Sequence, residues 1–323
     1  KSLSSKKPTP EIYPLLSIQI FHRENKQMIE FLTTLINGLS QGGVYALIAL
    51  GYTMVYGIGK MLNFAHGDII MAGGYTVMLF FSAIGSFYTA IAVCIVLAIL
   101  ACTLAGVAVE RFAYRPLRGA SPLAVLITAI GVSYLLQSAA QMIFGVEPVN
   151  IPLNRLGSVT IGKLTVDGAA IVTLLSAVVI MAGLTLFVNK TKTGKAMLAV
   201  SADKSAATLC GIGVNRIIML TFAIGSALAG VASFFIVLKT PTAVTPTMGS
   251  MPGIKAFTAA VIGGIGSIPG AMLGGVLLGV TESFLNAVPS VAPYTDAIEF
   301  APLIAILLEK PAGILGKTRK EKV

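Results

Sequence analysis

Long apolar runs that contain no Asp, Glu, Lys or Arg dominate the chain. They cover residues 31–59, 69–109, 119–146, 168–189, 217–238 and 256–281. A helix needs about 20 apolar residues to cross the hydrocarbon core of a membrane, and every run reaches that length. The run 69–109 is long enough for two crossings, so we expect a turn near Gly85 and Ser86.

This pattern predicts an all-α polytopic membrane protein with about eight to ten transmembrane helices, some of them short or broken. A shorter run, 300–308, joins the residues before it to make one more span. The runs are continuous rather than alternating, which argues against a transmembrane β-barrel. Composition agrees, because 55% of the residues are hydrophobic and only 11% are charged, values outside the range of soluble domains. The 34 glycines suit close packing of helices in lipid.

The net charge of +10 comes largely from three basic clusters beside the apolar runs, which indicates a membrane protein rather than one that binds nucleic acid. By the positive-inside rule, we expect these clusters in the cytoplasm. The loop 146–167, in which acidic and basic residues balance, is then external, the N-terminus is external and the C-terminus is cytoplasmic. The clusters are Arg111, Arg115 and Arg118; Lys190, Lys192, Lys195 and Lys204; and Lys310, Lys317, Arg319, Lys320 and Lys322.

One segment, GKAMLAVSADKSAATLCGI (194–212), interrupts the apolar pattern with charged and small residues. We expect it to form a cytoplasmic helix that stops at Gly211. Four of its residues stand at helical spacing and would give one face of small side chains. Such a face lets a helix enter a groove of another protein, although an ordinary solvated loop helix explains the spacing as well. The four residues are Asp203, Ala206, Ala207 and Cys210.

This segment and the sequence after it, VNRIIMLTFAIGSALAG, resemble the cytoplasmic loop and next helix of LivH-type permeases, the membrane subunits of branched-chain amino acid ABC importers. The resemblance covers nearly all of residues 28–323. The other matching stretches are GVYALIALGYTMVYG (43–57), MLNFAHGD (61–68), VERFAYRPLRG (109–119), KAFTAAVIGGIGSIPGAMLGG (255–275) and PAGILG (311–316).

The resemblance implies that residues 194–211 are a coupling helix, which contacts an ATPase and transmits its motion. It also implies three kinds of partner: cytoplasmic ABC ATPase subunits, a second related permease subunit and an external substrate-binding protein. The expected cargo is leucine, isoleucine and valine, and the expected location is the bacterial plasma (inner) membrane. The coupling residues would be Gly194, Lys195, Asp203, Ala206, Ala207 and Gly211.

The chain has no G-x-x-x-x-G-K-[S/T] sequence, so we expect no nucleotide and no other cofactor in it. ATP and Mg²⁺ would be used by the separate ATPase, and this chain would be a transport subunit, not an enzyme. The stretch GGIGSIPG (263–270) fits tight packing or a helix break rather than phosphate binding. A permease for urea or short amides is the closest alternative. A stand-alone secondary transporter and a purely structural membrane protein fit less well.

Two glycine-interrupted regions, around 38–74 and 249–279, indicate where a substrate crosses, because broken helices in transporters face water-filled cavities. We expect the translocation path between them. Polar residues in or beside such regions are candidates for function. The candidates are Asn63, His66, Asp68, Lys255 and Glu282.

Two of these candidates flank the run 256–281, and three follow the first span. We expect Lys255 and Glu282 in different segments or at opposite ends, so that an ion pair between them is possible but not required. For Asn63 and Asp68, capping of the next helix is favoured over substrate contact. His66 titrates near neutral pH in its ordinary form, but nothing in the sequence supports a proton-coupled role.

We divide the chain into an N-terminal extension (1–27), one transmembrane permease domain (28–316) and a basic cytoplasmic tail (317–323). The extension has no counterpart in the resemblance, and we interpret it as non-native or disordered. Cys94, Cys102 and Cys210 lack metal-binding or disulfide spacing, so we expect no metal site and three buried, small hydrophobic side chains.

Overall fold

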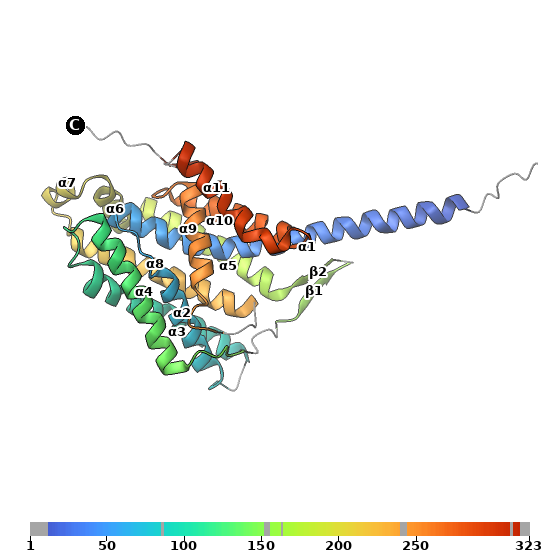
Figure 1. Ribbon diagram of the computed structural model, residues 1–323, viewed down its shortest axis with the longest axis horizontal. Coiled ribbons are helices and arrows are strands. Elements are labelled where there is room, and N and C mark those ends of the chain that lie inside the picture. Colours follow the sequence, from blue (N-terminus) through green and yellow to red (C-terminus); the bar gives the residue numbers. More distant parts are fainter. Residues whose placement is uncertain are drawn as a thin grey trace, which may run out of the picture.

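The computed structural model describes residues 12–84, 87–151, 156–162, 164–239, 244–310 and 313–316; side chains are described from residue 26 onward, apart from residue 161. This part of the chain is a bundle of helices with one short antiparallel hairpin (Figure 1). The elements are α1 (Ile12–Gly59), α2 (His66–Phe81), α3 (Phe87–Val109), the π-helix η1 (Glu110–Tyr114), α4 (Pro122–Phe144), β1 (Ser158–Ile161), β2 (Leu164–Asp167), α5 (Gly168–Lys190), α6 (Lys192–Ala202), α7 (Lys204–Leu209), α8 (Val214–Lys239), α9 (Ser250–Gly263), α10 (Ile268–Asn286), the 3₁₀-helix η2 (Ala292–Tyr294) and α11 (Thr295–Glu309).

The helix lengths confirm an all-α polytopic membrane protein. Three shorter helices, α2, α9 and α11, pack in the same bundle as the long ones, and α2 and α3 lie on either side of the expected turn near Gly85 and Ser86. Those two residues themselves are outside the described residues. Among the described residues, six helical segments are long and apolar enough to cross a membrane: Lys26–Gly59, Phe87–Tyr114, Pro122–Phe144, Gly168–Lys190, Val214–Lys239 and Ile268–Asn286.

The apolar run 256–281 is two helices rather than one span. α9 ends at Gly263 and α10 begins at Ile268. Between them, Gly264 and Gly266 have φ of 107° and 95°, a region that favours glycine. The hydroxyl of Ser267 then accepts a hydrogen bond from the N–H of Gly270 at 3.3 Å and caps α10. The sequence GGIGSIPG is therefore the predicted helix break.

Helix α1 forms the centre of the bundle. Every residue from 42 to 55 is buried, as expected for a helix that is apolar on all faces and surrounded by others. The closest approach is to α10, where glycines remove the side chains between the two backbones. A Cβ atom on Gly279 would lie 2.1 Å from the backbone nitrogen of Gly42. The two glycine-interrupted regions of the sequence thus pack directly against each other.

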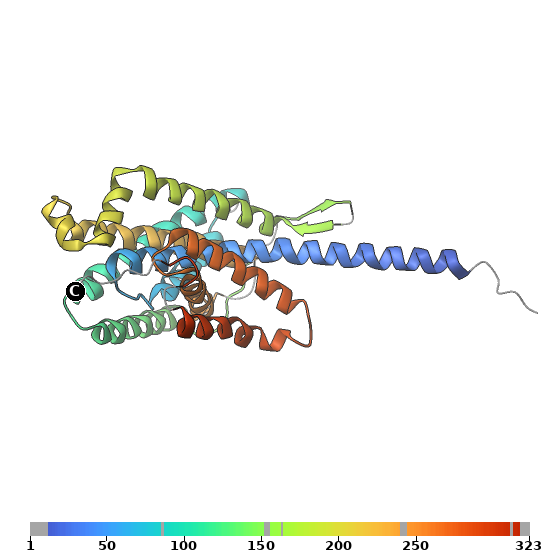
Figure 2. The same cartoon turned by 90° about the horizontal axis from the view of Figure 1, so that it is seen from above.

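The two ends of the bundle differ in charge. Helices α6 and α7 and the turn between α3 and α4 lie at one end, and the β1–β2 hairpin and the projecting part of α1 lie at the other (Figures 1 and 2). The basic clusters that begin at Arg111 and at Lys190 therefore lie at the same end of the bundle, and the balanced loop 146–167 lies at the opposite end. This agrees with the expectation that the two clusters share one side of the membrane and the loop is on the other. The assignment of the first end to the cytoplasm stays a prediction.

The proposed N-terminal extension is only partly described. Residues 12–27 are the beginning of α1 and continue without a break into the first span, so the proposed boundary at Met28 lies within a helix. Residues 1–11 and the proposed tail, 317–323, are outside the described residues. The division of the chain at these two boundaries stays a prediction.

Candidate functional site

The polar segment is two short helices, not the single helix expected from the sequence. Asp203 separates α6 from α7, with an extended backbone (φ −155°, ψ 118°). Its carboxylate accepts hydrogen bonds from the N–H groups of Ser205 at 2.7 Å and Ala206 at 3.0 Å, which makes it the N-cap of α7. Asp203 is therefore a cap between two helices and not the start of one continuous helical face, whereas Ala206, which is exposed, and Ala207, which is buried, do lie in α7.

The predicted stop at Gly211 is confirmed. Its φ is +78°, and its N–H bonds to the carbonyl of Thr208 at 2.9 Å. The N–H of Ile212 bonds to the carbonyl of Ala207 at 3.0 Å. Together these bonds form a Schellman motif, which ends a helix with a left-handed residue and satisfies its last carbonyls.

The six predicted coupling residues divide into two groups by exposure. Gly194 and Ala207 are buried within the chain, and a Cβ on Gly194 would lie 2.3 Å from the carbonyl oxygen of Val188, so this glycine serves the corner between α5 and α6. Lys195, Asp203, Ala206 and Gly211 are exposed. These four remain available to a partner.

Two apolar residues on this surface were not among the predicted coupling residues. Leu209 is 91% exposed and Leu198 is 50% exposed, although both lie in the most polar helical segment of the chain. They give this polar segment two exposed apolar side chains. The signal that could have identified them is the presence of two leucines in a segment that otherwise consists largely of charged and small residues. We call Leu198, Ala206 and Leu209 with the exposed residues around them the α6–α7 surface.

The α6–α7 surface is tied to the end of α1. The hydroxyl of Ser201 donates a hydrogen bond to the carbonyl of Gly57 at 2.8 Å, and the ammonium of Lys204 donates to the carbonyl of Gly59 at 2.9 Å. Burial, together with the nearby Arg118, lowers the pKa of Lys204. A displacement of α7 would therefore pull directly on the central helix.

A cavity of about 290 Å³ lies where α1, α2, α4 and α9 meet. Its walls are mainly apolar, with a few polar groups contributed by α2, α4 and α9. This combination is typical of small-molecule sites. The lining residues are Tyr52, Phe64, Gly67, Asp68, Ile130, Ser133, Tyr134, Gln137, Ser250, Gly253, Ile254 and Phe257.

Asp68 is the acidic group of this cavity. It lies in the first turn of α2, where the helix dipole favours a negative charge, and it accepts a hydrogen bond from Nε2 of Gln137 at 2.8 Å. Gln137 also donates to the hydroxyl of Ser133 at 3.2 Å. The carboxylate is thus held at the wall by α4 and faces a mainly apolar space.

The N-cap of α2 is Ala65, which makes no side-chain cap hydrogen bond, so the expectation that Asn63 or Asp68 is the N-cap is wrong. Asp68 does stand in the first turn of α2, where its charge complements the helix dipole as expected. Asn63 is buried, and its Oδ1 accepts a hydrogen bond from the hydroxyl of Tyr114 at 3.0 Å. His66 is buried against the ring of Tyr52, with ring centroids 4.7 Å apart, and does not line the cavity. Of the three candidates after the first span, only Asp68 reaches the cavity.

Gly67 and Gly253, which line the cavity, belong to the two glycine-interrupted regions and bring them into contact. A Cβ on Gly249 would lie 1.9 Å from the carbonyl oxygen of Gly67, and one on Gly253 would lie 3.2 Å from the Cα of Gly67. The structure therefore places a cavity between the two regions. That a substrate moves through it stays a prediction.

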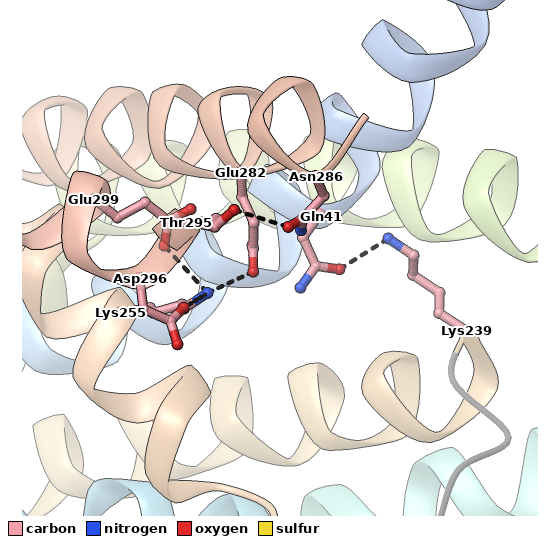
Figure 3. A network of polar contacts seen from close by, with 8 residues as sticks. All are labelled: Gln41, Lys239, Lys255, Glu282, Asn286, Thr295, Asp296 and Glu299. Carbon is pink, nitrogen blue, oxygen red and sulfur yellow. Dashed lines mark hydrogen bonds and ion pairs between the residues drawn. The ribbon is translucent and has the colours of Figure 1, made fainter. Parts of the chain in front are cut away.

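Lys255 and Glu282 form a separate cluster of charges, away from the cavity lining. Sequence analysis left their pairing open; the structure brings Lys255 Nζ to 2.5 Å from Glu282 Oε1. Two further carboxylates that the sequence analysis missed complete the cluster: Asp296 at 2.8 Å and Glu299 at 3.1 Å from the same Nζ (Figure 3). We call these four residues the Lys255 cluster. It joins α9, α10 and α11.

Further polar side chains lie beside the Lys255 cluster (Figure 3). The hydroxyl of Thr295 donates to Oδ1 of Asn286 at 2.9 Å and connects α11 to α10. Lys239 of α8 donates to Oε1 of Gln41 of α1 at 3.0 Å. Sequence spacing could not identify this arrangement, because its members come from five different helices.

The cysteines follow the sequence expectation at two of three positions. Cys94 and Cys102 are buried, whereas Cys210, next to the end of α7, is exposed. Among the described residues, no group of three or more His, Cys, Asp or Glu side chains is arranged to hold a metal ion.

Comparison with known proteins supports a transport role. Residues 34–307 match the family model described as branched-chain amino acid transport system / permease component. The chain is 43% identical over 307 residues to the high-affinity branched-chain amino acid transport system permease protein BraD of Pseudomonas aeruginosa, covering 92% of this chain and 99% of BraD. It is 41% identical over 309 residues to LivH of Escherichia coli K12, covering 93% and 100%. A probable LivH of Methanocaldococcus jannaschii is 27% identical over 288 residues. No solved structure matches significantly.

Proposed function

This chain belongs to the family of permease components of branched-chain amino acid transport systems, and we propose that it is the membrane subunit of an ATP-driven ABC importer for leucine, isoleucine and valine. The observation that carries the proposal is the identity to BraD and LivH over nearly the whole of each chain. In this proposal an external binding protein delivers the substrate, a second related permease completes the path, and separate cytoplasmic ATPase subunits hydrolyse ATP. This chain does no covalent chemistry.

Co-purification and uptake competition test the proposal. The complex extracted in mild detergent should contain an ATPase subunit; a chain that transports without one would be a secondary transporter. Leucine, isoleucine and valine should compete with one another for uptake, whereas urea and short amides should not. Competition by urea or amides alone would favour the alternative permease class.

We propose that the α6–α7 surface receives the ATPase. Leu198 and Leu209 provide apolar contacts, and Ala206 leaves room for a partner side chain. The hydrogen bonds of Ser201 and Lys204 to the end of α1 then carry the motion to the central helix. Because α1 lines the cavity through Tyr52, movement at this end reaches the proposed path.

We expect Ala206→Trp to abolish uptake while the protein remains in the membrane. The side chain of Ala206 is exposed, so the larger residue fits the isolated chain but collides with a docked partner. Gly119→Trp is the matched control, because Gly119 is exposed and has no neighbour within 4 Å of an added Cβ. The measurement is leucine uptake by membrane vesicles, with ATPase recovery in pull-down. Normal uptake by Ala206→Trp would contradict the docking assignment.

We also propose that the cavity at Asp68 binds the substrate during transport. An amino acid carries an ammonium group, which a buried carboxylate can bind, and a branched hydrocarbon side chain, which Ile130, Ile254 and Phe257 can surround. Urea and amides carry no positive charge, so the Asp68 carboxylate favours the amino acid over these alternatives.

We expect Asp68→Asn to lower the rate of leucine uptake at low substrate concentration at least about tenfold, because a hydrogen bond to a charged group contributes about 1.5–3 kcal/mol. Asparagine preserves the shape of the side chain and can still accept from Gln137. Glu30→Gln is the matched control, since the Glu30 side chain is exposed and forms a surface ion pair with Lys26. Wild-type kinetics in Asp68→Asn would exclude Asp68 from substrate recognition.

A further inference from the structure

The Lys255 cluster has more negative than positive groups. Three carboxyl groups, Glu282, Asp296 and Glu299, approach the single ammonium of Lys255. Among the described side chains, no second cation is within ion-pair distance of these carboxyl groups. Lys239 of α8 donates to Gln41 instead, and Tyr45 of α1, which lies beside Glu282, is a neutral group. If all four groups were ionised, the cluster would carry two uncompensated negative charges.

The three carboxyl groups differ in their surroundings. Glu282 is the closest to Lys255 Nζ, at 2.5 Å, and its side chain is 14% exposed, so these two residues form a neutral ion pair. The side chain of Asp296 is 54% exposed, which allows water to stabilise its charge. The side chain of Glu299 is 0% exposed, and apart from the ion pair with Lys255 Nζ at 3.1 Å neither of its oxygens accepts a hydrogen bond from a described residue.

Glu299 is therefore the group that cannot keep a negative charge. Its distance of 3.1 Å from Lys255 Nζ is within ion-pair range, but that ammonium is already nearer to Glu282 and Asp296. Burial disfavours the charged form of a carboxyl group, and two neighbouring carboxylates disfavour it further. A buried ionised group without sufficient compensation costs so much free energy that it takes up a proton instead.

We infer that Glu299 is a proton-binding site: it holds one proton at neutral pH in the folded protein, and this proton lets α11 pack against α9 and α10. Release of the proton gives the cluster a second uncompensated negative charge, which repels Glu282 and Asp296 and drives α11 from the bundle. This inference rests on the geometry of the cluster alone and does not depend on the substrate or on the proposed transport cycle.

The inference fixes the sign of a pH effect. The folded state holds a proton on Glu299 at a pH where the unfolded chain, whose glutamate is in water, has lost it. Stability falls with rising pH wherever the folded state binds more protons than the unfolded state. The contribution of Glu299 is thus greatest in acid and is lost as the pH rises through neutrality. Glutamine has the shape of the protonated acid and cannot ionise, so it removes this dependence.

The test uses the full chain, purified with its co-purifying subunits in detergent. Thermal unfolding is followed from mildly acidic to alkaline pH for the parent, Glu299→Gln and Glu282→Gln. We expect Glu299→Gln to unfold closest to the parent's temperature at the acidic end of this range, and at a higher temperature than the parent at neutral and alkaline pH, where the unfolded parent has lost the proton. Glu282→Gln should lose several degrees, because it breaks the neutral pair. Infrared spectroscopy should show a carboxylic-acid C=O band that Glu299→Gln lacks.

Two results would overturn the inference. A loss of stability in Glu299→Gln as large as that in Glu282→Gln would show that Glu299 is ionised and paired with Lys255. A rise in the parent's unfolding temperature when sodium replaces choline, absent in Glu299→Gln, would show that a metal cation and not a proton balances the charge. The infrared band decides independently of stability, since its presence in Glu299→Gln excludes Glu299 as its source.

Discussion

Replacing Lys255 with methionine is expected to destabilise the protein by roughly 3–5 kcal/mol, the range found when one partner of a buried ion pair is removed. Methionine fills a similar volume but leaves Glu282 buried without its cation, and Asp296 loses the same partner. Because α11 is held to α9 and α10 through this ammonium, the loss should release α11. The measurement is thermal unfolding of the purified chain with its subunits, together with protease sensitivity of the segment after α10.

A surface lysine provides the matched control for this prediction. Lys26→Met removes the partner of Glu30, but both side chains are largely exposed, so the change should be within about 0.5 kcal/mol. The double variant Lys255→Met with Glu282→Gln should regain part of the lost stability, because it removes the stranded charge. Unchanged unfolding of Lys255→Met would mean that the Lys255 cluster does not hold the three helices together.

Gly279→Ala is expected to disrupt the contact between α1 and α10 and to reduce leucine uptake severely. The added methyl group would lie 2.1 Å from the backbone nitrogen of Gly42, so one of the two helices must move. Overpacking of this kind costs typically about 1–3 kcal/mol, and more where backbone rather than a flexible side chain stands in the way. Thermal unfolding and uptake by membrane vesicles measure the two effects.

A Gly→Ala substitution in another helix tests whether the effect of Gly279→Ala comes from packing between helices or from the helix propensity of alanine. Gly131 lies in α4, is exposed, and has no neighbour within 4 Å of an added Cβ. Gly131→Ala should therefore leave stability unchanged or raise it by roughly 0.5–1 kcal/mol, through the lower backbone entropy of alanine in the unfolded chain. Equal behaviour of Gly131→Ala and Gly279→Ala would show that the α1–α10 contact tolerates a methyl group.

Local sequence patterns predicted the features that short stretches of chain determine. The apolar runs identified the long spans, GGIGSIPG marked the break between α9 and α10, and Gly211 marked the end of α7. These features depend on the residues at the position itself. Asp203 shows the limit of such local patterns. Its sequence position fits both a residue inside one continuous helix and an N-cap between two helices, and only the backbone of the folded chain distinguishes the two.

The candidate site was predicted in part. Asp68 was named from its position after the first span, and the cavity was expected between the two glycine-interrupted regions. The partner of Asp68, Gln137, comes from α4, whose apolar sequence gives no indication of which neighbour it contacts. Asp296 and Glu299 were missed because they follow the last long span and join Lys255 only in the folded protein.

The sequence by itself determined that this protein is an all-α membrane permease, since span length, hydrophobicity and motif order are properties of consecutive residues. Only the tertiary structure decided which faces of those helices meet: Gly279 against Gly42, Asp68 against Gln137, and three carboxyl groups around Lys255. The physical reason is that a span apolar on nearly every side has no pattern that marks its buried face. Helix rotation and register are set by packing between distant segments, where glycines allow close approach and a few buried polar groups must find partners.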